Sequence, residues 1–346
     1  MPRKSEKIFA GKKLKYQNKR NQVVACSNHV GSTFFIMISI IIPTFNEEKF
    51  LPKLLDTLKV QTFQDFEIIV ADCNSKDRTK EIAKKYGTRI TSGGSPARGR
   101  NNGAKIARGD LLVFLDADVK LPRYFLEKAI DEMHERNLDV STCPFKPLSN
   151  LFIDKVMHDF ANLSVKVSQF YSPHAPGFCI LIKKKIFERI HGFDEDLKIA
   201  EDHDLIVKAS RISQFRLLHS THVLVSVRRL KKEGRFVLIG KYFRVEFHRA
   251  FNGDLTKPLV NYEFGDFKER KANSRLMRIE KQIINLDKQF SILENKYFKT
   301  KSYLERLHKL RDNYDMLRKK LMAIYKNNLN NARNKLKNGN FFDKTS

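Results

Sequence analysis

The stretch from Leu111 to Pro122 constrains the fold of this chain more than any other part of the sequence. Its first five residues, Leu111 to Leu115, are all apolar, which predicts a buried strand of a parallel sheet. Two carboxylates, Asp116 and Asp118, follow directly. Ligands of open α/β sheets bind beyond the carboxyl ends of the strands, and hard divalent cations prefer oxygen ligands. The pair is therefore a candidate cation site, with a strand-end turn that only caps the next helix as the alternative.

Strands and helices alternate on both sides of this stretch. We expect further strands at residues 38–42, 66–71, 89–91, 139–143, 178–182 and 223–227. We expect helices at residues 47–60, 77–86, 96–108, 123–137, 151–171, 185–191 and 201–212. Strands separated by helices of about 10–15 residues are typical of βαβ units. The sequence thus predicts an α/β fold with a mainly parallel sheet flanked by helices.

The chain is strongly basic, with 66 Lys and Arg against 39 Asp and Glu and a formal net charge of +27. Such an excess favours anionic partners, which include phosphorylated substrates, an acidic membrane surface and nucleic acid. The four cysteines are far apart in the sequence, which argues against a zinc site or a disulfide framework and favours a reducing cytoplasm. The most apolar window, residues 34–42, is too short to cross a bilayer, which takes about 20 residues.

Five short blocks together resemble the ordered signature of family 2 glycosyltransferases. They are Pro43–Glu48, Asp72–Thr79, Ala97–Gly103, Asp116–Asp118 and Glu201–Asp202. Each block alone is a weak signal, but five in order at plausible spacing are specific. The resemblance covers roughly residues 37–230 and implies a GT-A fold, which is Rossmann-like, and a nucleotide-sugar donor.

The resemblance also implies which residues bind the donor. Pro43, Thr44, Phe45 and Glu47 would contact the nucleobase, with Phe45 stacked on it and Asp72 accepting from a ring N–H. A helix-capping role is the alternative for Asp72.

Four arginines would lie near the diphosphate. Arg98 and Arg100 stand where a loop leads into a helix, a position that favours anions, although surface charges are the alternative. Arg228 and Arg229 resemble basic residues that some members place over the diphosphate, and a strand-end charge pair is the alternative.

Metal binding and catalysis complete the implied site. Asp116 and Asp118 would hold Mg²⁺ or Mn²⁺ against the diphosphate, and Asp116 would also meet the ribose. His219 is a weaker candidate for a third metal ligand, because a histidine satisfied within the fold is the commoner case. Asp202 is the candidate general base of an inverting transfer. Glu201 beside it is either a second catalytic carboxylate or a helix-start charge.

Two departures from the family pattern limit the assignment. Lys120 stands where the branch that acts on polyprenyl phosphates often carries Gln, and no transmembrane helix is expected to follow, which weakens a lipid-phosphate acceptor. The run Asp72-Cys73-Asn74 replaces a more usual acidic-Gly pattern, so the nucleobase stays open.

The composition changes along the chain and predicts several segments. Residues 1–36 form a basic, disordered leader, residues 37–250 the GT-A domain, residues 251–267 a linker, and residues 339–346 a tail. Apolar residues repeat in heptads between Leu276 and Ile324, which predicts a basic helical coiled coil over residues 268–338. A helical hairpin folded back on the catalytic domain is the alternative.

The sequence therefore predicts a metal-dependent, inverting glycosyltransferase that acts on a hydroxyl of an unknown glycan, glycolipid or small molecule. The coiled coil would form a homodimer or tether a cytoplasmic enzyme to the anionic inner face of the membrane. The alternative from another class is a catalytically inactive scaffold that binds nucleic acid or membrane through its basic tails. A nucleotidyltransferase is disfavoured, because no Gly-rich phosphate loop follows the first strand.

Overall fold

The computed structural model describes residues 37–170, 173–197, 200–235, 237–238, 278, 280–289 and 316. Its first half contains β1 (Ile38–Thr44), α2 (Leu51–Lys59), β2 (Phe66–Asp72), α3 (Thr79–Lys85), β3 (Arg89–Ser92), α4 (Pro96–Ile106), β4 (Leu111–Leu115), β5 (Val119–Lys120) and α5 (Phe125–Glu135). Its second half contains β6 (Val140–Thr142), β7 (Phe145–Pro147), α6 (Phe152–Ser168), β8 (Cys179–Lys183), α7 (Lys184–Arg189), α8 (Glu201–Ser210), β9 (Phe215–Leu217), β10 (Val223–Val225) and α9 (Arg228–Glu233).

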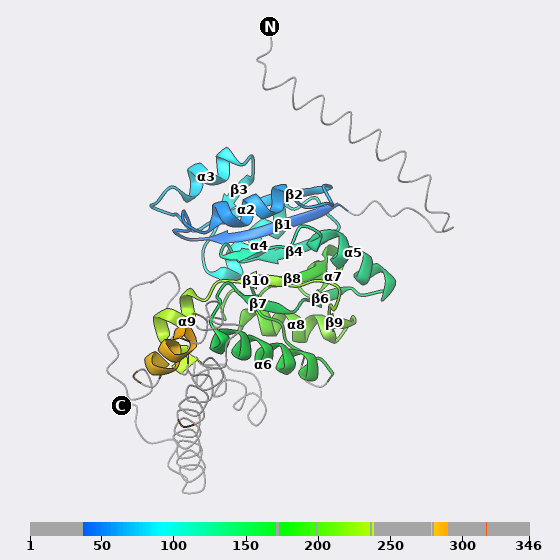
Figure 1. The fold of residues 1–346 in the computed structure, drawn as a ribbon. Helices are drawn as coiled ribbons and strands as arrows, with labels where there is room; N and C mark the ends of the chain where they lie inside the picture. Colours follow the sequence, from blue (N-terminus) through cyan, green and yellow to red (C-terminus); the bar gives the residue numbers. More distant parts are fainter. Residues whose placement is uncertain are drawn as a thin grey trace, which may run out of the picture. The chain divides into compact units, whose positions relative to one another are not determined.

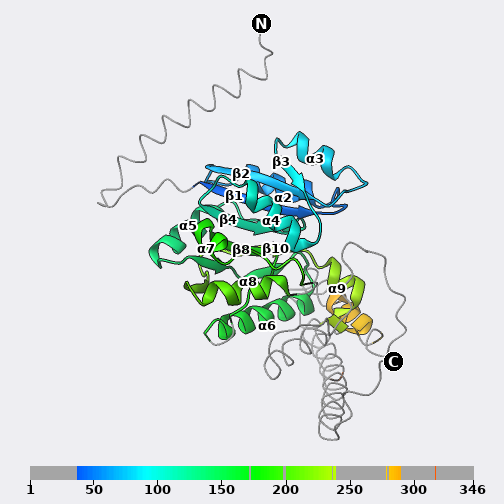
Figure 2. The ribbon, with the colours of Figure 1, turned by 180° about the vertical axis from the view of Figure 1, so that it is seen from behind.

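A seven-stranded sheet in the order β3-β2-β1-β4-β8-β6-β9 organises the domain. The strands β3, β2, β1 and β4 are parallel neighbours, whereas β8 lies antiparallel between β4 and β6. A smaller sheet has the order β5-β10-β7, and each of its strands comes directly after a strand of the larger sheet in the sequence. Figures 1 and 2, which are opposite views, both show α3 and β3 at one end of this domain and α6 at the other. The predicted α/β fold with a mostly parallel sheet is confirmed.

The core follows the apolar pattern of the sequence. All five residues of β4 are buried, as the run from Leu111 to Leu115 predicts. The helix α2 buries Leu51, Leu54, Leu55 and Leu58, one every three or four residues, so that a single face packs inward. Each fully buried Leu contributes about 1.5–3 kcal/mol relative to an exposed one.

Glycine sets how closely α4 approaches the sheet. A Cβ atom built on Gly103 would collide with the Ile41 side chain of β1, whereas one on Gly99 would make an ordinary contact of 3.4 Å with Pro43 Cβ. Gly103 therefore allows α4 to lie directly against β1. This packing brings the start of α4 to the carboxyl ends of the strands.

The observed elements differ from the predicted ones mainly where they are short. Strands β5, β7 and β9 and helix α9 have at most six residues and no apolar period long enough to read. The helix expected at residues 47–60 begins only at Leu51, because Asn46 has a φ of 54° and the chain turns before the helix starts.

Part of the C-terminal region contacts this domain. Residues 280–289 are helical, and Glu280 pairs with Arg235, which also pairs with Asp154 of α6. Asp287 accepts a hydrogen bond of 2.5 Å from the backbone N–H of Phe152. For this segment the contacts agree with a helix folded back on the domain. Apart from residues 278 and 316, the rest of residues 268–338 lies outside the described residues, and so do the leader 1–36, the linker 251–267 and the tail 339–346. The coiled coil therefore stays a prediction.

No helix among the described residues is both long and apolar enough to span a membrane.

Candidate active site

The carboxyl ends of β1, β2 and β4 lie at one edge of the sheet, because these strands are parallel neighbours. Thr44 at the end of β1 is in register with Asp72 at the end of β2, and its hydroxyl donates to Asp72 Oδ2 over 3.1 Å. Ser75 donates to the same carboxylate through its backbone N–H and its hydroxyl. Asp72 thus holds the turn after β2 in place. It does not cap α3, because the backbone N–H of Thr79, the first residue of that helix, donates to Asp77 instead.

Arg100, near the start of α4, joins acidic side chains from two distant segments. Its Nη1 lies 2.8 Å from Glu201 Oε1, and its Nη2 lies 3.0 Å from Asp116 Oδ1. Only 4% of the Arg100 side chain is exposed. The backbone N–H of Gly177 donates to Asp202 Oδ2 over 2.6 Å, and the Gly177 carbonyl accepts from Arg100. We call these five residues, Arg100, Asp116, Gly177, Glu201 and Asp202, the Arg100 cluster.

Burial and charge act in opposite directions on the acids of this cluster. Burial raises the pKa of Asp202, whereas the positive charge of Arg100 and two backbone N–H donors lower it, and the net pKa is above the usual value. Burial and the charge of Asp202 likewise raise the pKa of Glu201. Burial alone would lower the pKa of Arg100, but the charges of Asp116 and Glu201 outweigh it and raise the pKa. The guanidinium is therefore held charged inside the protein.

Local backbone geometry brings Asp202 to this point. Ala200 has a φ of 65°, in the left-handed region, and α8 begins at the next residue. Both Glu201 and Asp202 therefore lie in the first turn of α8, where the helix dipole favours negative charge.

Gly177 is a site residue that the sequence analysis missed. A Cβ atom on it would lie 2.9 Å from Arg100 Nη2 and 3.0 Å from Asp202 Oδ2. Glycine is needed here because the backbone passes between two buried charged groups. An isolated Pro-Gly pair in a loop carries no signal of this role.

Arg228, the first residue of α9, is the centre of a second cluster, in which it binds two acidic side chains. Its Nη1 and Nη2 donate to the two carboxylate oxygens of Glu47 over 2.8 and 2.7 Å, and its Nε lies 2.8 Å from Asp118 Oδ2. The guanidinium also lies over the Phe50 ring, 4.6 Å from its centroid. We call these residues, Arg228, Glu47, Asp118 and Phe50, the Arg228 cluster.

Burial sets the acidity of this cluster. It raises the pKa of Glu47 to about 7, although the bidentate contact with Arg228 lowers it. It also raises the pKa of Asp118 to about 6, again against Arg228, and the charge of Asp116 adds to the rise. The charge of Asp116, which belongs to the Arg100 cluster, raises the pKa of both Glu47 and Asp118. The two clusters therefore interact electrostatically.

The carboxylates Asp116 and Asp118 fit a hard divalent cation. Such ions are often bound by one or two carboxylates together with phosphate oxygens of a substrate. Within the described residues no group of three or more His, Cys, Asp or Glu side chains is arranged to hold a metal. His219 therefore does not gather with the two aspartates, and its backbone N–H donates instead to Glu132 of α5.

Two of the four predicted arginines lie outside both clusters. Arg98 pairs with Glu195 over 3.0 Å, and 61% of its side chain is exposed. Arg229 pairs with Glu233 one turn along α9. Pro43 is the second-last residue of β1, and the half-buried Phe45 directly follows the strand.

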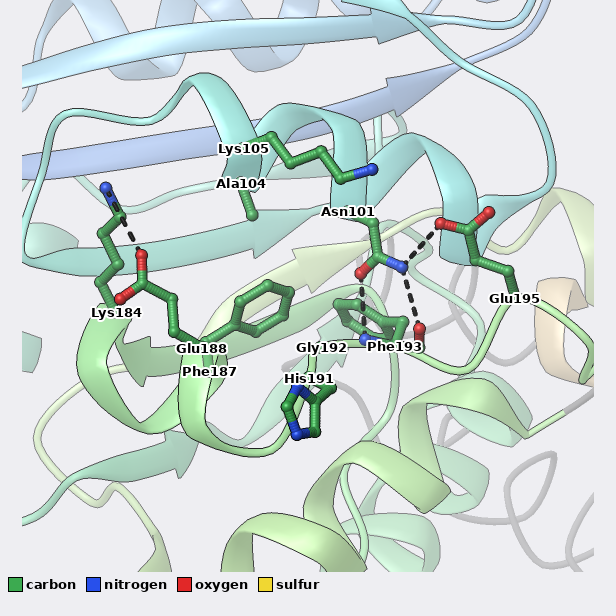
Figure 3. Close-up of a pocket in the computed structure, with 10 residues that line it drawn as sticks. All are labelled: Asn101, Ala104, Lys105, Lys184, Phe187, Glu188, His191, Gly192, Phe193 and Glu195. Carbon is green, nitrogen blue, oxygen red and sulfur yellow. Dashed lines mark hydrogen bonds and ion pairs between the residues drawn. The ribbon is translucent and has the colours of Figure 1, made fainter.

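Asn101 stabilises the position of Arg100 from the next residue of α4. Figure 3 shows its side chain bonded to the backbone of Phe193 and to Glu195, and the Phe193 ring in turn lies 5.3 Å from the Arg100 guanidinium. A cavity of about 380 Å³ opens beside it, and its lining residues include none of the carboxylates of the two clusters. This cavity is therefore separate from the candidate active site.

Comparison with known proteins places the domain. Residues 39–190 match the sequence model described as Glycosyl transferase family 2. An uncharacterized glycosyltransferase of Bacillus subtilis, EpsJ, is 29% identical over 193 residues, which are 51% of this chain and 56% of that protein. The poly(ribitol-phosphate) beta-N-acetylglucosaminyltransferase TarS of Staphylococcus aureus is 29% identical over 186 residues, which are 49% of this chain and 32% of that protein. The matched part of the chain thus spans about a third of TarS and just over half of EpsJ.

A solved structure shows the same fold. The mannosyltransferase PcManGT of Pyrobaculum calidifontis, in complex with GDP-Man and Mn²⁺, matches with a TM-score of 0.53 and 19% identity. The match covers 72% of this chain and 74% of that one. The match over residues 39–190 identifies this part of the chain as a glycosyl transferase family 2 domain, and the domain has a GT-A-like fold.

Proposed function

We propose that this protein is a metal-dependent, inverting glycosyltransferase that moves a sugar from a nucleoside-diphosphate sugar to a hydroxyl acceptor. The observation that carries the proposal is the Arg100 cluster. It joins a carboxylate at the end of β4, Asp116, to a buried carboxylate at the start of α8, Asp202. Transfer needs these two functions together, because one group holds the donor and the other accepts a proton.

The donor would bind across the ends of β1, β2 and β4. The paired Thr44 and Asp72 offer a hydroxyl and a carboxylate to the nucleobase, and Phe45 offers a ring on which the base can stack. The GDP-Man bound to the mannosyltransferase PcManGT supports a nucleotide-sugar donor for this fold. The identity of the base stays open.

Asp116 and Asp118 would hold Mg²⁺ or Mn²⁺ against the diphosphate. A bound divalent cation neutralises the charge that develops on the departing nucleoside diphosphate. Burial, and to a lesser extent the charge of Asp116, raises the pKa of Asp118 to about 6, and a cation between the two carboxylates would favour their charged forms. The Mn²⁺ of the PcManGT complex supports the same class of metal.

Asp202 would take the proton of the acceptor hydroxyl as its oxygen attacks the anomeric carbon opposite the leaving group. A carboxylate whose pKa is raised toward neutrality is a better base than an ordinary one. The N–H groups of Gly177 and His203 donate to its two oxygens and fix their direction. Glu201 would act as a positioning residue, because its carboxylate is bound to Arg100.

Replacement of Asp202 by Asn tests the base. We expect donor affinity to stay within about twofold while turnover falls roughly 100- to 10,000-fold, the usual contribution of a general base. Isothermal titration with UDP-, GDP- and TDP-sugars measures the affinity, and nucleotide release measures the turnover. A fully active variant would exclude Asp202 as the base.

Replacement of Asp118 by Ala tests the metal site. Thermal-shift measurements with the same donors, with and without Mn²⁺, should show a Mn²⁺-dependent stabilisation for the natural chain and none for the variant. The exposed Asp196→Ala is a matched control that should behave as the natural chain. Equal stabilisation of the Asp118 variant would contradict the metal assignment.

The acceptor and the assembly of the protein remain predictions. The acceptor is a hydroxyl of a glycan, a glycolipid or a small molecule. The homodimer and the tether to an anionic membrane rest on residues 268–338, most of which lie outside the described residues. Loss of all nucleotide-sugar turnover together with salt-sensitive nucleic-acid binding would instead favour the inactive scaffold.

A further inference from the structure

The helix α6 exposes apolar side chains along one lane. Val156, Leu163 and Val167 are about half exposed, with exposed fractions of 46%, 55% and 50%. Phe170, just beyond the end of the helix, is 73% exposed. Phe152 and Phe160 continue the same lane. The spacing of three or four residues places all of these side chains on a single face.

The opposite face of α6 holds the helix to the domain largely through polar groups. Asp154 is fully buried and pairs with Arg235, and Asn162 exchanges two hydrogen bonds with the backbone of Phe145 in β7. Gln169 accepts from the backbone N–H of Leu217 in β9. Ile153 and Val165 are also buried on the helix, so its inward face combines polar anchors with apolar residues, while the apolar lane faces outward.

Positive charge borders the exposed lane. Lys155 and Lys166 are exposed on α6, against the single exposed acid Asp159 on the same helix. At the C-terminal end, the Arg216 guanidinium lies 5.4 Å from the centroid of the Phe170 ring, and the exposed Arg211 lines the same depression as both. Among the described residues, four cations thus border the apolar lane, against the exposed Asp159 on α6 and the buried Asp287 at the N-terminal end of the helix.

We propose that this lane of α6 is the surface through which the protein docks onto a bilayer that contains anionic lipids. A helix at a membrane interface inserts its apolar side chains among the acyl chains while flanking Lys and Arg bind headgroup phosphates. Long basic side chains can reach the headgroups as the helix sinks. The contact lies on the folded domain itself, so it is distinct from a tether made by the basic tails.

A second copy of the chain fits this face less well. A twofold contact would bring the same patch of two molecules together, so that Lys155 and Lys166 of one copy would approach the cations of the other. An exposed apolar surface such as this lane of α6 is typical of an interaction site. The Lys and Arg side chains beside it favour a negatively charged partner.

Vesicle binding by the full chain tests the proposal. The variant Leu163→Ser/Val167→Ser should bind vesicles of equal parts phosphatidylcholine and phosphatidylglycerol roughly 10-fold or more weakly than the natural chain, because apolar groups leave the interface. The matched control Val60→Ser/Tyr124→Ser removes two side chains that are 57% and 50% exposed elsewhere on the domain, and it should bind as the natural chain does. All three proteins keep every Lys and Arg, so attraction by the basic tails is the same.

The possible outcomes distinguish a bilayer from a second copy of the chain as the partner of this lane. Loss of binding in the α6 variant alone, with an unchanged melting temperature, supports the bilayer, and weaker binding of the natural chain to pure phosphatidylcholine supports the role of the cations. Equal vesicle binding by all three proteins would overturn the proposal. So would a fall in oligomeric mass of the α6 variant, measured by sedimentation velocity, without a change in vesicle binding, because the lane would then join two copies.

Discussion

The Arg100 cluster and the Arg228 cluster share the same kinds of contact, but they differ in how deeply they are buried. In each, one arginine binds carboxylates that come from distant parts of the chain, and a ring lies against the guanidinium. The side chain of Arg100 is 4% exposed, whereas that of Arg228 is 24% exposed. Arg100 belongs to an eleven-residue helix packed on the sheet, and Arg228 begins a helix of six residues.

This difference suggests different roles for the two arginines. A buried guanidinium with three fixed acceptors cannot leave without stranding charges inside the protein. A partly exposed one at the start of a short helix can exchange a carboxylate for another anion at little cost. We therefore expect Arg100 to act as a fixed positioning residue and Arg228 to bind the diphosphate of the donor.

The largest effect is expected from Arg100→Met. Removal of the guanidinium leaves Asp116 and Glu201 without their buried partner, and breaking such a buried pair costs about 3–5 kcal/mol. The free energy of unfolding in urea measures this loss. The exposed pair of Arg98 with Glu195 provides the control, since Arg98→Met should cost less than about 1 kcal/mol. Similar losses in both variants would mean that Arg100 is not a structural centre.

A smaller effect is expected from Gly177→Ala. The new Cβ would press on Arg100 and Asp202, and displacement of a base by a fraction of an ångström should lower turnover about 10- to 100-fold. Donor affinity should change little, and comparison of kcat with KM for the donor separates the two effects. Gly99→Ala is the matched control, because its Cβ would make an ordinary contact of 3.4 Å. A greater loss of turnover in the Gly99 variant would mean that turnover depends more on the packing of α4 than on Gly177.

The smallest effect on stability is expected from Arg228→Met, at about 1 kcal/mol, because solvent partly replaces the lost contacts. Donor affinity should nevertheless fall about 10-fold if this guanidinium exchanges onto the diphosphate. Arg229→Met controls for the charge, since Arg229 pairs within its own helix and should contribute at most about 0.5 kcal/mol. Unchanged donor affinity in the Arg228 variant would contradict a role in diphosphate binding and would mean that both arginines are positioning residues.

Sequence patterns predicted the strands and helices of the parallel half well. The run from Leu111 to Leu115 is β4 with the predicted bounds, and the apolar face of α2 is buried as expected. Those predictions rest on local periodicity, which the sheet and the helix impose on neighbouring residues. Elements of two or three residues, such as β5 and β7, have no period and were missed.

The candidate site was predicted as a set of residue types but not as a set of contacts. Arg100 and Arg228 carried the same expectation, that each lies near a diphosphate, yet one is buried among acids and the other is partly exposed. Arg98 and Arg229, their neighbours in sequence, lie outside both clusters. Adjacent residues on a helix point in different directions, and the packing of the helix decides which one faces the site.

The sequence by itself determined that acidic residues follow strands of an α/β sheet, because strand periodicity and the positions of Asp72, Asp116 and Asp118 are local properties of the chain. Only the tertiary structure decided that Arg100 meets Glu201 across 101 residues and Arg228 meets Glu47 across 181. The same holds for the apolar lane of α6, whose period a sequence reader assigns to the core. Which face of a helix turns inward is set by the partners available to it, and those partners come together only in the folded chain.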